Sequence, residues 1–190
     1  MTAARHAKHS DKRDRLIDAA RVLFHRRGFG ETSLADIARE SGVPVGNVYY
    51  YFKTKEDIAA AVIEHYRVHM AGIAQIAEKR PTARERILSM LDSLACDCDA
   101  IAHSGCPMGS LCVEFGKRDT ALREEANRLL LRMIEWVERQ FAGMARTDAR
   151  ALAIQLVSTV QGASVLALAM HDPGILRQEL ARMKTVVEAL

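Results

Sequence analysis

The sequence is poor in aromatic residues and in proline. Only four of its 190 residues are proline and 5% are aromatic, whereas 49% are hydrophobic. Long stretches rich in Ala, Leu, Glu and Arg run between the prolines, and no stretch shows the alternating Val, Ile and Thr of a half-buried strand. This composition predicts an all-α protein that is long enough for one or two hydrophobic cores.

The chain also lacks a secretory leader and an uninterrupted apolar run of about 18 residues. Residues 151–170 come closest to a membrane span, but polar residues such as Gln155 and Gln161 interrupt them. The four cysteines fall between Cys96 and Cys112, in a C-x-C-x7-C-x5-C order that misses the usual zinc spacings. We therefore expect a cytoplasmic protein with free thiols, no membrane association, no metal and no cofactor.

Charge is unevenly distributed, although the formal net charge is only +3. Residues 1–55 carry 11 Lys and Arg against 6 Asp and Glu, and the remainder carries 16 against 18. A basic first quarter on a near-neutral remainder is typical of a nucleic-acid-binding head attached to a different kind of body. A charged, solvated face is the ordinary alternative, and charge alone does not decide between the two.

The stretch TSLADIARESGVPVGNVYYYFKTK, residues 32–55, predicts a helix, a tight turn and a second short helix. Thr32 or Ser33 is placed to cap the first helix, with Asp36 as a capping-box partner. Gly42 is expected to end that helix, and Pro44 suits the first turn of the next one.

The second of these helices leaves side chains outside that do not suit a core. Val48 should point inward with Phe52, so the three adjacent tyrosines cannot all be buried. Tyrosine hydroxyls and lysine ammonium groups suit DNA phosphates, while Asn47 can pair with adenine and Gly46 lets the backbone approach the groove floor. An aromatic-rich packing corner is the alternative. The predicted DNA-binding residues are Thr32, Ser33, Val45, Gly46, Asn47, Tyr49, Tyr50, Tyr51, Lys53 and Lys55.

These motifs resemble the DNA-binding domain of the TetR family of bacterial transcriptional repressors. The resemblance rests on TSLADIA, SGVPVGNVYYYF and KTKEDI, and with DRLIDAARVLFHRRGF it extends from Arg13 through Ile63. It implies a three-helix DNA-binding head, residues 1–53, and a helical effector-binding and dimerisation domain, residues 54–190. It also implies a homodimeric repressor that binds a palindromic double-stranded operator and is released by a small molecule or an electrophile.

Hydrophobic periodicity predicts the remaining helices. A mobile arm, Met1 to Ser10, should precede the first helix. The predicted helices outside the motif are Asp11 to Gly28, Thr54 to about Lys79, Pro81 or Thr82 to about His103, the segment MGSLCVEFG, Asp119 or Thr120 to about Met144, Asp148 to Met170, and Pro173 to Leu190. The helix from Thr54 links head to body, and in the family it transmits ligand binding. His65 and His69, spaced i and i+4 on it, could hold a metal on one face, but no nearby ligand completes the site.

Cys106 is the chemically interesting cysteine, because it follows Gly105 at a predicted helix start, where thiolate is favoured. The segment G-C-P-x-G-x-L-x-x-E resembles a TetR subgroup that includes repressors of detoxification genes, some with an electrophile-sensing cysteine here. A structural thiol is the alternative. A small helical redox protein or enzyme that uses Cys106 with His103 is the rival function, but no catalytic triad order, phosphate loop or carboxylate pair supports it.

The body should hold the effector and the dimer interface. We expect an apolar, aromatic or electrophilic effector near Cys106, Met108, Met133 and Trp136, although Met and aromatic side chains at helical spacing are also ordinary core. Residues 151–170 are apolar on almost every side, so two helices from each subunit should form a four-helix interface, as in the family. The predicted interface residues are Leu156, Gly162, Val165, Leu180 and Met183. A structural DNA-binding protein without an effector would have little use for so large a body.

Overall fold

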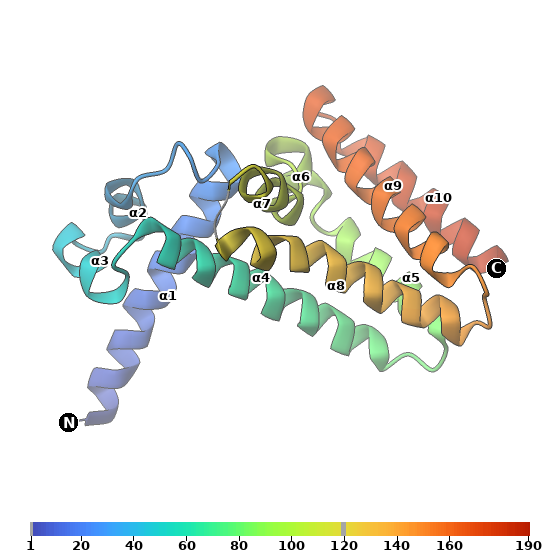
Figure 1. The fold of residues 1–190 in the computed structure, drawn as a ribbon, viewed down its shortest axis with the longest axis horizontal. Helices are drawn as coiled ribbons and strands as arrows, with labels where there is room; N and C mark the ends of the chain where they lie inside the picture. The colour runs from blue at the N-terminus through green and yellow to red at the C-terminus, as the bar shows by residue number, and fades with distance from the viewer. Residues whose placement is uncertain (1, 119–120) are drawn as a thin grey trace.

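The computed structural model describes residues 2–118 and 121–190, with side chains from Asp11 onward, and within those residues it is all-α (Figure 1). The described helices are α1 (Thr2–Arg27), α2 (Leu34–Ser41), α3 (Val45–Tyr51), α4 (Lys55–Glu78), α5 (Ala83–Ala95), α6 (Cys98–Ser104), α7 (Pro107–Gly116), α8 (Ala121–Gly143), α9 (Ala149–Met170) and α10 (Pro173–Ala189). The predicted fold class is confirmed.

The first three helices form a small head with its own apolar centre, seen at the left of Figure 1. α2 packs on α1 and α3 packs on α2, while α4 leaves the head along α1. The side chains that meet at this centre are almost wholly buried, and they include Leu16, Phe24, Ile37, Val48 and Phe52. Burying them favours the folded head at roughly 25 cal/mol per Å² of apolar surface.

Capping signals place the ends of the head helices where the sequence predicts them. The Ser33 hydroxyl accepts from the backbone amide of Asp36 at 3.1 Å, and the Asp36 carboxylate accepts from the Ser33 amide at 3.0 Å. Gly42 ends α2 with φ at 64°, a left-handed conformation that glycine adopts without strain. A second capping box, between Thr54 and Asp57, starts α4.

Two predicted helix limits are wrong. α1 begins at Thr2, so the backbone of the expected N-terminal arm continues the first helix. The helix expected to run to His103 ends at Ala95, and α6 follows from Cys98. The amide of Asp97 bonds to Leu94, three residues back, so the last turn tightens and the chain changes direction. The predicted start of the next helix, Asp119 or Thr120, lies outside the described residues.

The body is a bundle in which α4 and α8 run side by side through the centre of the view (Figure 1). α9 packs against α8, α6 and α10, and α10 closes over α5. α1 touches both α4 and α6, so the head and the body share a contact surface. By length and composition alone α9 could cross a membrane, a test that core helices of soluble proteins also pass, and here its inner side packs on neighbouring helices.

Candidate nucleic-acid interface and effector cavities

α3 has one buried side and one open side. Val48 is fully buried, whereas Tyr50 is 66% exposed and Tyr49 is 50% exposed. Gly46 is also open, since no atom lies within 4 Å of a Cβ built on it. The first turn of α3 therefore offers bare backbone flanked by large side chains with hydroxyl donors. Such a surface fits a helix that enters a DNA groove.

Three of the predicted DNA-binding side chains are engaged inside the head instead. Thr32 is 1% exposed, and its hydroxyl donates to the carbonyl of Gly28 at 2.8 Å. Lys55 Nζ donates to the carbonyl of Phe29 at 2.8 Å and lies 4.2 Å from the centroid of that ring. Tyr51 is half-buried and packs against the core. The Thr32 hydroxyl is therefore already bonded inside the head, whereas the Lys55 ammonium has three N–H donors and its predicted phosphate contact stays a prediction.

The other predicted DNA-binding residues lie at or near the surface of the head. Ser33, Val45 and Lys53 are exposed, and Asn47 is half-buried on α3. Lys53 Nζ donates to the carbonyl of Tyr49 at 2.9 Å, which holds its charge beside the end of α3. The exposed candidates thus gather on one side of the head, around α3.

α7 joins the body to the head through Glu114. The Glu114 carboxylate accepts from the amide of Phe29 at 2.8 Å and from the amide of Gly30 at 2.6 Å. The rings of Phe29 and Phe115 pack with their centroids 4.9 Å apart. His25 Nε2 lies 2.5 Å from the carbonyl of Gly105, just before α7, and acts as the donor there. Sequence analysis missed these contacts, because their partners lie about 80 residues apart.

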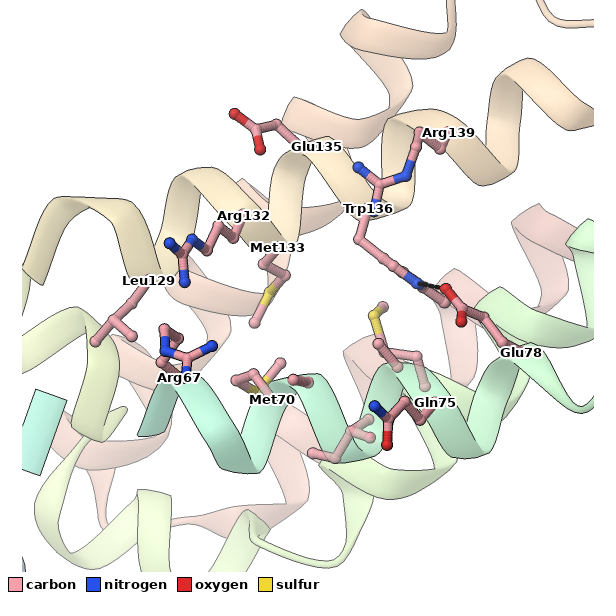
Figure 2. Close-up of a pocket in the computed structure, with 14 residues that line it drawn as sticks. Arg67, Met70, Gln75, Glu78, Leu129, Arg132, Met133, Glu135, Trp136 and Arg139 are labelled. Carbon is pink, nitrogen blue, oxygen red and sulfur yellow. Dashed lines mark hydrogen bonds between the residues drawn. The ribbon is translucent and has the colours of Figure 1, made fainter. Parts of the chain in front are cut away.

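An outer cavity of about 310 Å³ lies between α4 and α8, with α5 at its base (Figure 2). Its floor is apolar and includes Met70, Met133 and Trp136, and Trp136 Nε1 donates to Glu78 at 3.1 Å. Figure 2 shows Arg67 extending from α4 and Arg132 extending from α8 at one end of the cavity. Met133 and Trp136, two of the predicted effector contacts, are thus brought to one cavity.

A second cavity of about 220 Å³, called the inner cavity, lies where α1, α4, α6, α7 and α9 meet, and the exposed residues His65, His69 and Asp97 lie on its rim. Met70, Ile73 and Met133 line both cavities, so the two chambers share an apolar wall. The inner cavity differs from the outer one in its polar groups. Those groups are Arg21, His25, His65, Tyr66, His69, Asp97, Cys106, Gln161 and Ser164.

Three of the predicted effector contacts, Cys106, Met108 and Met133, line the inner cavity. The Cys106 sulfur caps α7, because the amide of Gly109 points at it from 3.5 Å, and Gln161 Nε2 donates to it from 3.4 Å. A Cβ at Gly109 would clash with Gln161 Oε1, so a larger residue there would require the Gln161 side chain to move.

The other three cysteines differ from Cys106. Burial raises the pKa of the Cys112 thiol to about 11, and its sulfur donates to the carbonyl of Ala126. Burial also raises the pKa of the fully buried Cys98, while Cys96 is exposed. Cys106 is half-buried and also lines an open cleft between α7 and α9, together with Val113 and Val165.

His65 and His69 lie on one face of α4 and both line the inner cavity. Within the described residues they do not belong to any group of three or more His, Cys, Asp or Glu that could hold a metal ion.

The predicted dimer interface needs correction. Leu156, Leu180 and Met183 are buried inside the protomer, where they fasten α9 and α10 to the bundle. Gly162 and Val165 are exposed, and Val165 is 64% exposed. They share the outer side of α9 with three further exposed apolar residues, Ile154, Leu166 and Met170. These residues make an exposed apolar surface, the outer face of α9, defined by Ile154, Gly162, Val165, Leu166 and Met170.

Comparison with known families gives two matches along the chain. Residues 16–62 match the family model described as bacterial regulatory proteins, tetR family. Residues 83–181 match a second model, described as the C-terminal domain of LmrA/YxaF-like transcriptional regulators. Together they cover the head, the start of α4 and most of the body.

Individual proteins also match this chain along almost its whole length. The HTH-type transcriptional regulator LmrA of Bacillus subtilis (strain 168) is 27% identical over 180 residues, which cover 93% of this chain and 91% of that protein. An uncharacterized HTH-type regulator in the lacX 3' region of Lactococcus lactis is 23% identical, with 93% of each chain covered. The crystal structure of a TetR transcriptional regulator from Legionella pneumophila superposes with a TM-score of 0.82 at 22% identity, covering 90% of this chain and 95% of that one.

Proposed function

The chain belongs to the TetR family of bacterial transcriptional regulators, and from that premise we propose that it is a repressor that binds a palindromic operator as a homodimer. A small molecule bound in its helical body releases it from DNA. The proposed location of the protein is the cytoplasm, where the bacterial chromosome lies. Residues 1–53 act as the reading head, and residues 54–190 act as the sensing and dimerising body.

The open side of α3 carries this proposal. Gly46 and the exposed Val45 would face the base edges, and Asn47 would approach them from the adjacent position. Tyr49, Tyr50 and Lys53 would contact the phosphates that flank the groove. Ser33, at the start of α2, would contact a phosphate of the other DNA strand. Phosphate contacts fix the position of the head, while the contacts of α3 select the sequence.

The outer face of α9 supplies the symmetry that a palindrome requires. An exposed apolar strip on a soluble protein indicates an interaction surface. Two copies of α9 and α10 packed about a twofold axis would cover Val165 and Leu166 and form a four-helix interface. The two heads would then lie about 34–36 Å apart, or a multiple of that, and so would the half-sites of the operator.

The effector is proposed to bind in the inner cavity, where residues of the head and the body line the same space. Arg21 and His25 come from α1, while Met108 and Cys106 come from the start of α7. A ligand that fills this space contacts both domains and can favour one of two arrangements of the head. Trp136 and Met133 would contact a larger ligand that extends into the outer cavity.

Covalent sensing by Cys106 is a second mode, supported by the two donors that point at its sulfur. The thiolate would attack an electrophilic carbon and form a C–S bond, as in addition to an activated alkene, where the carbanion formed takes a proton from solvent. The product would replace a half-buried sulfur at the start of α7 with a larger group.

Selection from a pool of random duplexes tests the proposed function. Wild-type protein should enrich a palindrome, and its affinity for that duplex should exceed its affinity for unselected DNA at every salt concentration in a titration. Enrichment of no common sequence would contradict the proposal and would favour non-specific DNA binding.

A further inference from the structure

One cation and two imidazoles from two helices line the inner cavity. α1 contributes the Arg21 guanidinium, and α4 contributes the imidazoles of His65 and His69. Asp97 is the only carboxylate among the residues that line this cavity. A guanidinium and several hydrogen-bond donors among the polar lining residues favour a ligand that supplies negative charge and hydrogen-bond acceptors.

Arg21 has an unmet requirement for an acceptor. Its Nε is buried without a hydrogen-bond partner and is the only such side-chain nitrogen or oxygen in the described part of the chain. The Arg21 side chain as a whole is 37% exposed, and this same Nε forms a long ion pair with a carboxylate oxygen of Asp18, 3.7 Å away on a side chain that is 60% exposed. Buried donors are almost always paired in folded proteins, so an unpaired one beside a cavity indicates a missing partner.

The neighbours of Arg21 show the same shortage of negative charge. Burial and the charge of Arg21 lower the pKa of His65, with Asp18 opposing them only in part. Burial raises the pKa of the Tyr66 hydroxyl, which lines the cavity, and the charge of Arg21 and a hydrogen bond from Arg21 to the hydroxyl oxygen oppose that rise. His25 donates to the carbonyl of Gly105, so its Nε2 proton is already committed.

The rest of the cavity wall is apolar, with Ile73, Met108, Met133, Val160 and Leu176 on it. A volume of about 220 Å³ suits a compact body of one or two rings, and the flexible side chains of Met108 and Met133 can adjust to its shape. A fully polar anion would leave these groups facing water or polar atoms, so the apolar wall argues for an amphipathic ligand.

We propose that the inner cavity binds a small apolar acid and that Arg21 holds its anionic group, with His65 and His69 beside it. The proposal rests on the effector role given to this cavity above and names the chemical class of the effector. Arg21 belongs to α1, which packs on α4, so a carboxylate bound to Arg21 lies next to the contact between the head and α4. Binding therefore favours the arrangement of the head in which this contact is closed around the ligand.

The test compares naphthalene-2-carboxylate with naphthalene-2-carboxamide, which has nearly the same shape and no charge. Isothermal titration calorimetry on the wild-type protein should show the carboxylate binding about tenfold tighter or more, the range expected for a charge-assisted hydrogen bond. Arg21→Gln should reduce that preference to about threefold or less, because the charge that distinguishes the two probes is gone. Arg21→Lys should retain part of the preference, because it keeps the charge.

Arg132→Gln is the matched control, since Arg132 lines only the outer of the two chambers. It should leave the carboxylate preference intact. If Arg132→Gln removes the preference and Arg21→Gln does not, the anion lies in the outer cavity and the proposal is overturned. Equal affinity of wild type for the two probes, or binding of neither at millimolar concentration, overturns it as well.

Two further measurements separate this site from the repressor function. Thermal unfolding must show that Arg21→Gln folds like the wild type, and Arg21→Lys serves as the charge-retaining variant if it does not. Affinity for the selected operator is measured without any probe. Operator binding without a carboxylate preference contradicts only the site, whereas a carboxylate preference in a protein that binds no operator supports the site and contradicts the repressor function.

Discussion

The Glu114 carboxylate accepts a 2.8 Å hydrogen bond from the backbone amide of Phe29, and so fastens the end of α7 to the loop that follows α1. Its second oxygen accepts from Gly30 at 2.6 Å. α7 starts at the inner cavity, with Cys106 as its cap, and ends at this contact. A change at the cavity therefore has a short, rigid path to the head, in addition to the path along α4.

Glu114→Gln should loosen this contact. Glutamine keeps one acceptor oxygen but turns an NH₂ group toward the second amide, so one donor of the loop loses its partner. We expect the free energy of unfolding to fall by about 1–3 kcal/mol, measured from urea unfolding curves. Glu124→Gln is the control, because Glu124 is an exposed residue of α8 that pairs with Arg128 on the same helix. Equal unfolding midpoints for Glu114→Gln and wild type would show that the contact adds no stability.

Asp36 should make the stability of the protein depend on pH. Hydrogen bonds from the Ser33 hydroxyl and amide, with Arg39 and Arg27 nearby, hold the pKa of Asp36 well below its ordinary value of 3.8. A lowered folded-state pKa means that the unfolded chain takes up the proton first as pH falls. The stabilisation of the folded state by ionised Asp36 is therefore complete above about pH 5 and is lost progressively below about pH 4.

Asp36→Asn should flatten the dependence of the urea midpoint on pH between about pH 5 and pH 3. Asp11→Asn, which alters an exposed carboxylate of α1, should keep the wild-type slope. A slope in Asp36→Asn as steep as that of wild type would place the acid sensitivity elsewhere in the molecule.

Val165→Asp should separate the subunits without unfolding them. Val165 is exposed in the protomer, so the new carboxylate stays hydrated in the monomer and would be buried only in the dimer. Sedimentation velocity should show a dimer for wild type and a monomer for the variant. Val68→Asp, at an exposed apolar residue of α4, should remain dimeric. A wild-type protein that sediments as a monomer at micromolar concentration contradicts the proposed interface.

Cys106 should react with limiting N-ethylmaleimide before the other cysteines. Its sulfur has two donors, whereas the pKa of Cys112 is raised to about 11 and Cys98 is fully buried. Cys96 is exposed but lacks a comparable pair of donors, so it should react second. Mass spectrometry of the labelled peptides gives the order. If alkylation releases DNA from wild type and equally from Cys106→Ser, this cysteine is not the switch.

Local signals made most of the fold predictable from the sequence. The caps at Ser33, Gly42 and Thr54 depend on residues three or four positions apart, and the burial of Val48 follows from helical spacing alone. The break at Asp97 has no proline or glycine to mark it, and it was missed.

The site was predictable only in part, because its contacts connect distant segments. Lys55 has the chemistry of a phosphate ligand, yet its ammonium bonds to Phe29, 26 residues earlier in the chain. Arg21 lies in a segment that sequence analysis assigned to the head alone, and only the folded chain places it in a cavity of the body. Leu180 likewise has the character of an interface residue, and only the packing of α10 shows that it is core.

The most direct test of DNA reading by α3 is the ratio of two dissociation constants, for the selected operator and for a scrambled duplex of the same composition. Fluorescence anisotropy at one fixed salt concentration measures both. Wild type should prefer the operator by about 10³-fold or more. Asn47→Ala should reduce this ratio by a factor that corresponds to about 1–3 kcal/mol of lost discrimination. Lys53→Ala should weaken both affinities alike and preserve the ratio. A wild-type ratio near one, or a ratio that Asn47→Ala leaves unchanged, would contradict the assignment of α3 as the helix that reads the operator.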